Sequence, residues 1–213
     1  MTLLRIDSSA RQQSVSRQLT SRFLEAWRAH HPGDTVIDRD LAKTTLPPVT
    51  DEWSATYGDP SLITPAQQRY LSLSDALIAE LYAADVIVIG APMYNLSISA
   101  ELKGWIDHVV RRGKTIAYDE KGPRGLLQGR SVIVASSRGG SYAPGSPRAS
   151  ADFQEPYLRE VLRSLGLTDV TFVHAENQAR PALAERSRAS ARDRLTQLAT
   201  QLTPEVVTHV RCD

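Results

Sequence analysis

Two short, nearly uninterrupted apolar runs constrain the fold of this chain more than any other feature. They read Val86-Ile87-Val88-Ile89 and Ser131-Val132-Ile133-Val134. A strand with this pattern is buried on both faces, as the inner strands of a parallel sheet are. Three further short runs are rich in aliphatic and β-branched residues, so the sequence predicts five strands in all, the others at residues 3–6, 35–37 and 170–173.

Longer amphipathic segments separate these strands. Thr64-Pro65-Ala66-Gln67 has the form of a capping box with proline at the first helical position, and Gly166 follows another helical segment as a stop signal. Strands that alternate with helices are typical of an α/β fold, here a three-layer, doubly wound five-stranded parallel sheet. The predicted helices cover residues 15–27, 64–81, 100–110, 155–165 and 181–202.

The chain shows no change in composition that would mark a linker, so we expect a single domain over residues 1–213. One stretch, 46–63, interrupts the alternation with three prolines and a glycine. This stretch is longer than the loops that usually connect a strand to a helix. It is therefore either a lid or interface loop, or a simple surface excursion.

Charge and cysteine content limit the partners and the compartment. With 25 Lys and Arg against 24 Asp and Glu, the chain lacks the basic surplus that nucleic acids and anionic membranes attract. The single cysteine, Cys212, excludes a disulfide framework and a thiolate metal cluster. The N-terminus lacks a signal-peptide pattern, and no apolar run reaches the roughly 18 residues of a membrane helix. We therefore expect a cytoplasmic protein that binds small molecules.

Ligands of open parallel sheets bind at the carboxyl ends of the strands, and the loop after the first strand is rich in serine. The helix that follows offers free N–H groups, and the hydroxyls of Ser9, Ser14 and Ser16 can join them around a phosphate. Arg11 and Arg17 can add positive charge. Alternatively, Ser14 or Ser16 only caps the helix.

The loop after the third strand reads GAPMYNLSIS, from Gly90 to Ser99. Its apolar side chains and the donor and acceptor of Asn95 suit a flat heteroaromatic ring with polar edges. Equally, this segment can be a rigid proline turn whose Met93 and Tyr94 belong to the core.

The loop after the fourth strand reads SSRGGSY, residues 136–142. Paired glycines at 139 and 140 let the backbone approach a ligand closely, although a turn that needs positive φ would use them too. Because all three loops meet at one edge of one sheet, they predict a phosphate site, a ring platform and a backbone clamp.

Absent motifs narrow the ligand. The chain has no GxGxxG, GxxxxGK[ST] or GxSxG, which disfavours a dinucleotide site, a P-loop and a hydrolase nucleophile. It has no HExxH motif, no metal site is predicted, and His174, at the end of the fifth strand, receives no role. A single terminal phosphate can be held by hydroxyls and helix N–H groups, whereas the pyrophosphate of a dinucleotide requires the protein backbone to approach it more closely. The serine loop therefore favours a mononucleotide.

Five motifs together resemble those of one enzyme family. They are the serine loop, "APMYNLSIS" followed by "ELKGWID", "YDEKGPRGLLQGR", "SSRGG" and "LTDVTFVHAE". In order and spacing the chain resembles the FMN-dependent NADH-azoreductases, also described as NADH:quinone oxidoreductases, of the flavodoxin-like superfamily. The resemblance implies a homodimer with FMN at each of two sites near the subunit interface, and NADH or NADPH as the electron donor.

The resemblance also implies roles for particular residues. Leu96 stands where family members often carry phenylalanine, which makes the pocket less aromatic and bears on substrate preference. Tyr118 would lie close to the substrate pocket and reach the flavin of the partner subunit. The implied cofactor-binding residues are Ser9, Ser14, Val15 and Ser16 at the phosphate, Met93, Tyr94, Asn95 and Leu96 along the isoalloxazine, and Ser137, Arg138, Gly139 and Gly140 at its other edge.

The implied activity is transfer of two electrons from NAD(P)H to quinones and aromatic azo compounds by a ping-pong mechanism. Since the flavin carries the redox step, no protein side chain is assigned as catalytic. The alternative is a flavodoxin-like electron carrier without its own substrate turnover, against which the near-zero net charge argues weakly. A hydrolase that uses the Ser9 region lacks an evident histidine partner.

Overall fold

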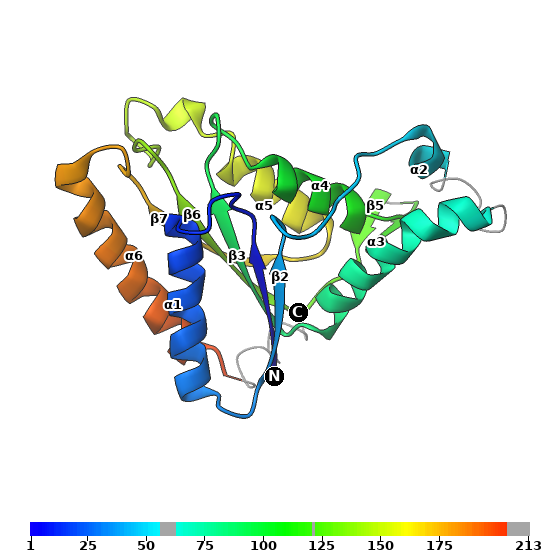
Figure 1. Ribbon diagram of the computed structural model, residues 1–213, viewed down its shortest axis with the longest axis horizontal. Coiled ribbons are helices and arrows are strands. Elements are labelled where there is room, and N and C mark those ends of the chain that lie inside the picture. The colour runs from blue at the N-terminus through cyan, green and yellow to red at the C-terminus, as the bar shows by residue number, and fades with distance from the viewer. Residues whose placement is uncertain (56–62, 121, 204–213) are drawn as a thin grey trace.

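The computed structural model describes residues 1–55, 63–120 and 122–203 (Figure 1). Five strands form one parallel sheet in the order β2-β1-β3-β6-β7, with helices on both faces, so the prediction of a three-layer, doubly wound α/β fold is confirmed. The elements in chain order are β1 (Thr2–Asp7), α1 (Val15–His30), β2 (Thr35–Asp40), α2 (Asp51–Ala55), α3 (Pro65–Ala83), β3 (Val86–Pro92), α4 (Ala100–Val109), β4 (Ile116–Asp119), β5 (Gly122–Gly125), β6 (Ser131–Ser137), the 3₁₀ turn η2 (Ala149–Ala151), α5 (Glu155–Ser164), β7 (Asp169–Ala175) and α6 (Pro181–Gln201).

Each face of the sheet has its own apolar layer. Helices α1 and α6 cover one face, where Phe23 and Trp27 are fully buried and stack with ring centroids 6.0 Å apart. Helices α3, α4 and α5 cover the other face, and Trp105 of α4 is buried there. The apolar residues recur at intervals of three and four because one stripe of each helix faces the sheet. The inner strand β3 is buried along its whole length, as its unbroken apolar sequence predicts.

The register of the strands brings three loops to one edge. Asp7 at the end of β1 pairs with Gly90 of β3, and Pro92 at the end of β3 pairs with Ser137 at the end of β6. All strands of this sheet run parallel, so their carboxyl ends lie on the same side. The loops after β1, β3 and β6 therefore emerge side by side, as the sequence predicts.

Helix boundaries follow the sequence signals closely. The capping box forms as predicted, because the side chain of Thr64 accepts from the Gln67 N–H while the Gln67 side chain accepts from the Thr64 N–H. The stop signal at Gly166 is also real, since this residue has a φ of 91°. At such a φ a side chain would be strained, which is why glycine ends the helical segment here.

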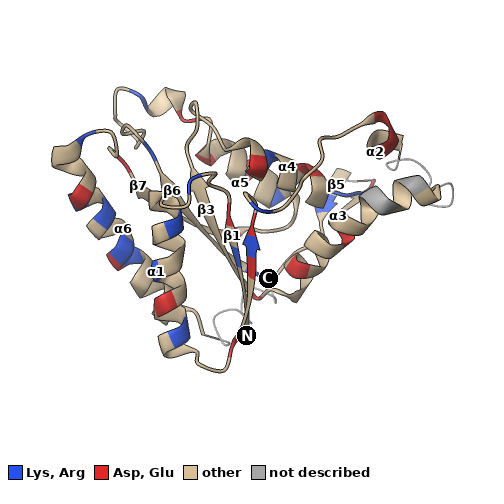
Figure 2. Ribbon diagram, in the orientation of Figure 1, with Lys and Arg blue, Asp and Glu red and all other residues tan. Residues whose placement is uncertain are grey.

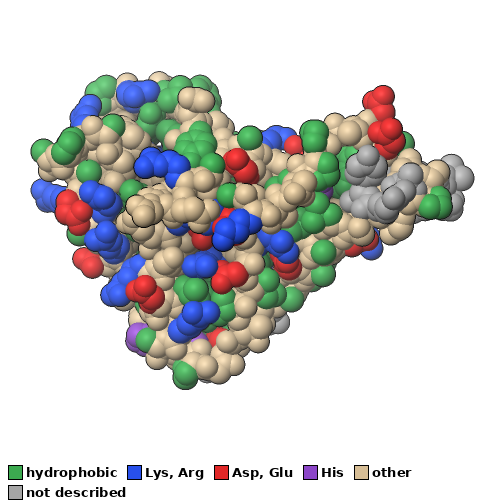
Figure 3. Space-filling view, in the orientation of Figure 1, with side chains coloured by type: hydrophobic (Ala, Val, Ile, Leu, Met, Phe, Trp, Pro, Cys, Tyr) green, Lys and Arg blue, Asp and Glu red, His purple; other side chains and the backbone are tan. Residues whose placement is uncertain are grey.

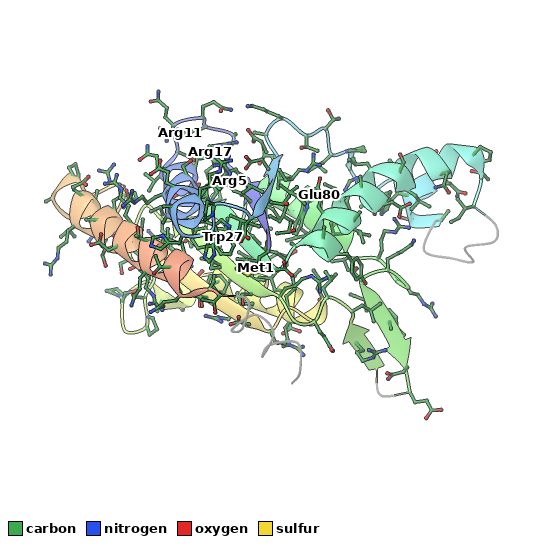
Figure 4. All side chains as sticks on the ribbon, turned by 90° about the horizontal axis from the view of Figure 1, so that it is seen from below. Met1, Arg5, Arg11, Arg17, Trp27 and Glu80 are labelled. Carbon is green, nitrogen blue, oxygen red and sulfur yellow. The ribbon has the colours of Figure 1, made fainter. Side chains whose placement is uncertain are left out.

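The short helix α2 and the β4–β5 ribbon lie outside the sequence prediction. Part of the stretch 46–63 forms α2, and Trp53 on α2 is buried against His108 with ring centroids 4.8 Å apart, while 56–62 fall outside the described residues. Strands β4 and β5 form an antiparallel ribbon apart from the main sheet, and Figure 4 shows this ribbon projecting from the body of the molecule.

Charges of both signs are interspersed on the helices in Figure 2, and the face in Figure 3 shows the same mixture over α1 and α6. Among the described helices, none has a stretch long and apolar enough to span a membrane. In the part of the chain that the structure describes, no three His, Cys, Asp or Glu residues come together as a metal site.

Candidate functional site

A pocket of about 190 Å³ opens where the three loops meet. It contains eight of the twelve cofactor-binding residues that the sequence analysis named, and it adds Arg11, Gln13, Pro92 and Gln178. The eight are Ser9, Ser14, Val15, Met93, Tyr94, Ser137, Arg138 and Gly139. The expectation that these loops form one site therefore agrees with the geometry of the fold.

One end of the pocket is the N-terminus of α1. Ser14 caps this helix, because its Oγ accepts the N–H of Arg17 at 3.3 Å, and the Oγ of Ser16 lies 3.2 Å from the Oγ of Ser14. Among the described residues, the N–H groups of Val15 and Ser16 donate to no other protein group. They carry the positive end of the helix dipole and are available to an anion. Capping and anion binding are thus compatible at this serine loop.

Of the two arginines expected to add charge, only Arg11 lines the pocket, and Figure 4 shows Arg17 on the sheet side of the same loop. Arg17 is turned away from the pocket: its Nε and a terminal nitrogen donate to the carbonyl oxygen of Ser9 at 3.1 and 2.7 Å. A hydrogen bond to the carboxylate of Asp40 raises the pKa of Arg17 above its ordinary value. Arg17 therefore holds the loop from behind.

Beneath the serine loop lies a buried carboxyl group. Asp7 is 5% exposed, and its Oδ1 accepts the hydroxyl of Thr20 at 2.7 Å. Burial raises the pKa of Asp7 above its ordinary value, although nearby Arg5 and Arg17 favour the charged form. A Cβ on Gly90 would come within 2.6 Å of this carboxylate oxygen. A larger residue at position 90 would therefore displace the Asp7 side chain or the first turns of α1.

The loop after β3 forms one wall of the pocket. The hydroxyl of Tyr94 lies 3.1 Å from the Oγ of Ser9, which joins this wall to the serine loop. Tyr94 and Ser97 exchange two backbone hydrogen bonds, of 2.9 and 3.0 Å, around a tight turn. Asn95 and Leu96 occupy this turn with φ values of 48° and 73°. Non-glycine residues in the left-handed region are uncommon and concentrate at functional sites, so the turn supports a binding role.

The loop after β6 is attached to the segment that follows β7. The carbonyl oxygens of Arg138, Gly139 and Gly140 accept N–H groups from residues 177–179, at 2.9 to 3.1 Å. The N–H groups of the two glycines have no acceptor within the described ranges. The N–H groups of Gly139 and Gly140 are therefore available to a ligand, while the carbonyl oxygens of this loop are already hydrogen-bonded within the protein.

His174, to which the sequence analysis gave no role, belongs to a polar network behind this loop. Its Nδ1 lies 3.0 Å from the Oγ of Ser136, and its Nε2 lies 2.7 Å from a carboxylate oxygen of Glu155. Hydrogen bonds from His174 and Arg159 lower the pKa of Glu155 to about 2. The three groups are far apart in the sequence, so no local motif could have revealed them.

Comparison with known proteins identifies the family. A family model described as flavodoxin-like fold matches residues 1–199. The FMN-dependent NADH:quinone oxidoreductase of a Nostoc species is 47% identical over 200 residues, 92% of this chain and 96% of that protein. The chain belongs to the flavodoxin-like family of FMN-dependent NADH:quinone oxidoreductases.

Further members agree with that assignment. The FMN-dependent NADH:quinone oxidoreductase of Azotobacter vinelandii is 44% identical over 200 residues, 92% of this chain and 98% of that protein. The crystal structure of azoreductase from Bacillus anthracis superposes with a TM-score of 0.88 at 28% identity, covering 95% of this chain and 100% of that one. The recognised family and the flavodoxin-like fold are thus confirmed together.

The pocket fits the FMN on which the named relatives depend. Its α1 end offers two free helix N–H groups and the hydroxyl of Ser14, which suits a phosphate. Its other end offers the free N–H groups of Gly139 and Gly140, which suit carbonyl oxygens of a ring. Donors at both ends and an apolar wall between them match a mononucleotide with a flat ring.

Four predicted site residues lie outside the lining of this pocket. Ser16 is fully buried behind Ser14, while Asn95 lines the adjoining groove next to Leu96. Gly140 follows the glycine that does line the pocket. Each of the four thus lies within two residues of one that lines the pocket.

Tyr118, the predicted substrate residue, lies elsewhere. It is on β4, is 59% exposed, and has the guanidinium of Arg112 5.5 Å from its ring centroid. It lines a separate pocket of about 440 Å³ that shares no lining residue with the pocket of the three loops. Within one chain, Tyr118 therefore does not join the site.

Proposed function

We propose that this protein is an FMN-dependent oxidoreductase that transfers two electrons from NADH or NADPH to quinones and aromatic azo compounds. The observation that carries the proposal is a pocket lined at two places by residues with unused N–H donors, Val15 and Gly139. Ser16 and Gly140, the next residues in the chain, have unused N–H groups as well. Such donors stabilise negative charge without reorganisation. Relatives that share nearly half of the sequence are named as FMN-dependent NADH:quinone oxidoreductases.

We assign the phosphate of FMN to the N-terminus of α1. There Ser9, Ser14 and Val15 line the pocket, and the Oγ of Ser16 lies 3.2 Å from the Oγ of Ser14. Arg11 lines the same end and adds positive charge. A helix N-terminus favours a dianion through both its N–H groups and its dipole.

We assign the isoalloxazine to the space between the two other loops. Met93, Tyr94, Asn95 and Leu96 would form the platform beneath the ring. The segment from Ser137 through Arg138 and Gly139 to Gly140 would face its polar edge, where glycine N–H groups stabilise negative charge. When bound, FMN supplies the redox chemistry, and this chain supplies binding, orientation and electrostatics.

The alternation of donor and acceptor at one flavin face predicts ping-pong kinetics. Purified protein saturated with FMN should show parallel lines in double-reciprocal plots of NADH oxidation at several benzoquinone concentrations. Repeating the assay with NADPH and with an azo dye defines the donor preference and the acceptor range. A flavin that NADH reduces but no quinone reoxidises at a catalytic rate would instead indicate an electron carrier, and intersecting lines would reject the ping-pong scheme.

We further propose that the protein acts as a homodimer in the cytoplasm. Tyr118 and Phe153 are among the most exposed large hydrophobic side chains, at 59% and 58%. Because Tyr118 lies apart from the pocket of its own chain, contact with a flavin requires the pocket of a partner. The low cysteine content is consistent with a reducing compartment.

A further inference from the structure

We propose that Arg138 is a positioning residue that sets the glycine loop against the ring platform and neutralises the carboxylates behind it. This inference rests on the proposed function, since it concerns the cleft between Met93 and Gly139 in which the flavin ring would lie. The side chain of Arg138 is 1% exposed, although the residue lies in the loop that borders the pocket. Its guanidinium therefore acts inside the protein and not as a surface ligand.

The guanidinium joins segments that are separate in the sequence. Its Nε donates to the Oγ of Ser136 at 3.1 Å and to the Oε1 of Gln154 at 3.2 Å. The other end of the fully buried Gln154 side chain donates to the carbonyl oxygen of Ala91 at 3.2 Å. Ala91 lies two residues before Met93, where the ring platform begins, so two hydrogen bonds through Gln154 connect the glycine loop to the opposite wall of the pocket.

A second path leads to the far end of the glycine loop. One terminal nitrogen of Arg138 lies 3.8 Å from the Oε1 of Glu176. The same carboxylate accepts the N–H of Tyr142 at 2.7 Å and the hydroxyl of Ser141 at 2.6 Å. Arg138 thus compensates the negative charge of Glu176, whose carboxylate binds Ser141 and Tyr142, the two residues after the paired glycines.

A third path leads to the turn beneath the ring. Arg138 pairs with Asp152 at 2.9 Å, and the residue after Asp152, Phe153, donates its N–H to the carbonyl oxygen of Leu96 at 3.1 Å. Because Leu96 has a positive φ, this turn needs support from the surrounding structure. The three paths together hold both walls of the proposed flavin site in one arrangement.

Arg138 also compensates negative charge next to the proposed flavin site. Glu155 lies 3.8 Å from Arg138 and also pairs with Arg159. Among the described residues, Asp152 and Glu176 have no cation within 4 Å other than Arg138. Without Arg138, the partly buried carboxylates of Asp152 and Glu176 would remain without a compensating cation beside the polar edge of the flavin. Negative charge there opposes the addition of electrons to FMN, so the midpoint potential would fall.

The test compares Arg138→Met, which keeps an unbranched apolar stem but removes the guanidinium, with Arg138→Lys, which keeps the charge. We expect R138M to weaken FMN binding to the apoprotein about 10- to 100-fold, the usual cost of losing a partner that orients a ligand-holding group. Amide exchange of apoprotein peptides spanning residues 138–142 should accelerate, and the FMN midpoint potential should become more negative. R138K should recover the potential but not the exchange protection, because lysine lacks the planar donors of arginine.

The matched control is Arg163→Met, which removes an exposed arginine paired with Glu160 on α5 and should change none of the three measurements. If R138M does not fold, Glu176→Gln replaces it, with faster exchange at Ser141 and Tyr142 and weaker FMN binding as the expected result. Wild-type exchange and FMN affinity in a folded R138M or E176Q would overturn the inference. Failure of the wild-type apoprotein to bind FMN would reject the proposed function, while exchange of the loop would still test Arg138.

Discussion

Ser14 contributes to helix stability and, in our proposal, to phosphate binding, and the two contributions can be separated. We expect Ser14→Ala to reduce the free energy of unfolding by about 1 kcal/mol through loss of the cap. Loss of a hydrogen bond to a charged group should also weaken FMN binding about tenfold or more. Urea titration of the apoprotein and fluorescence titration with FMN give the two quantities.

Thr64→Ala is the matched control, because Thr64 caps α3: its Oγ1 accepts the N–H of Gln67 at the same 3.3 Å. It should cost similar stability and leave FMN affinity unchanged. Equal effects of S14A and T64A on FMN affinity would show that Ser14 acts only as a cap.

Gly90 provides a test of packing beneath the serine loop. A methyl group there would lie 2.6 Å from the Oδ1 of Asp7 and 3.1 Å from the Cγ2 of Thr20. Gly90→Ala should therefore lower the free energy of unfolding by about 2 kcal/mol, as overpacking of a filled core does. In Gly33→Ala the methyl group meets nothing within 4 Å, so the change should stay within about 0.5 kcal/mol. A G90A protein as stable as G33A would contradict the close approach, and urea midpoints decide between them.

Individual residues at the site could be predicted only where the signal is local. The serines before α1 and the glycines after β6 follow strands that the sequence shows clearly, so their loops could be placed at one edge. The inward direction of Arg17 could not be foreseen, because its partners Ser9 and Asp40 are chosen by the fold. The same holds for Arg138, whose ion-pair partners lie as far away in the sequence as Glu176. Charged groups that pair across long distances in the sequence produce no repeating pattern from which the pairing could be predicted.

At the scale of elements, the first turn of α5 links the helix to the sheet through Glu155. Hydrogen bonds from His174 and Arg159 lower its pKa from 4.5 to about 2. The charged form is therefore favoured in the folded state, so the stabilisation is complete above about pH 4.5 and is lost as the pH falls toward 2. We expect Glu155→Gln to flatten the decline of stability over this acidic range, measured by urea titration at a series of pH values.

Glu160→Gln on the same helix serves as the control for that measurement. The side chain of Glu160 is 67% exposed, and among the described residues its ion-pair partner is the equally exposed Arg163, so solvent screens the interaction. Its substitution should leave the pH dependence close to that of the wild type. An acid profile of E155Q that matches the wild type would show that the carboxylate contributes little.

The helices and strands that could be predicted from the sequence are the ones long enough to show a repeating apolar pattern. The five strands of the sheet and the five long helices carry aliphatic runs or amphipathic repeats, and all were located. The short helix α2 has five residues, too few to show a period. In the β4–β5 ribbon, β5 reads Gly-Pro-Arg-Gly, which carries turn residues in place of a strand pattern. This ribbon is stabilised by pairing with β4, and pairing is not visible in the sequence of either strand alone.

At the scale of the whole molecule, the structure leaves an apolar groove beside the proposed flavin site. A groove of about 810 Å³ shares Tyr94 with the pocket of the three loops and is also lined by Ile98, Phe153 and Tyr157. Burial raises the pKa of Tyr157 above its ordinary value. The groove is also lined by the charged residues Lys103 and Asp152. Aromatic side chains with a few polar groups, next to the platform, suit the ring of a quinone or azo compound.

The proposed homodimer makes a prediction about shared sites. If Tyr118 of one chain completes the pocket of the other, Tyr118→Ala and Ser14→Ala/Ser16→Ala should each be nearly inactive at limiting FMN. In a mixed dimer, the intact pocket comes from the Y118A chain and the intact Tyr118 from its partner, so one site of two is complete. Random mixing should then restore about one quarter of wild-type quinone reduction, by the statistics of a two-fold assembly. Sedimentation of the wild type at twice the chain mass is the accompanying expectation. No recovery after subunits have demonstrably exchanged would place Tyr118 outside the site and leave the pocket of the three loops complete within one chain.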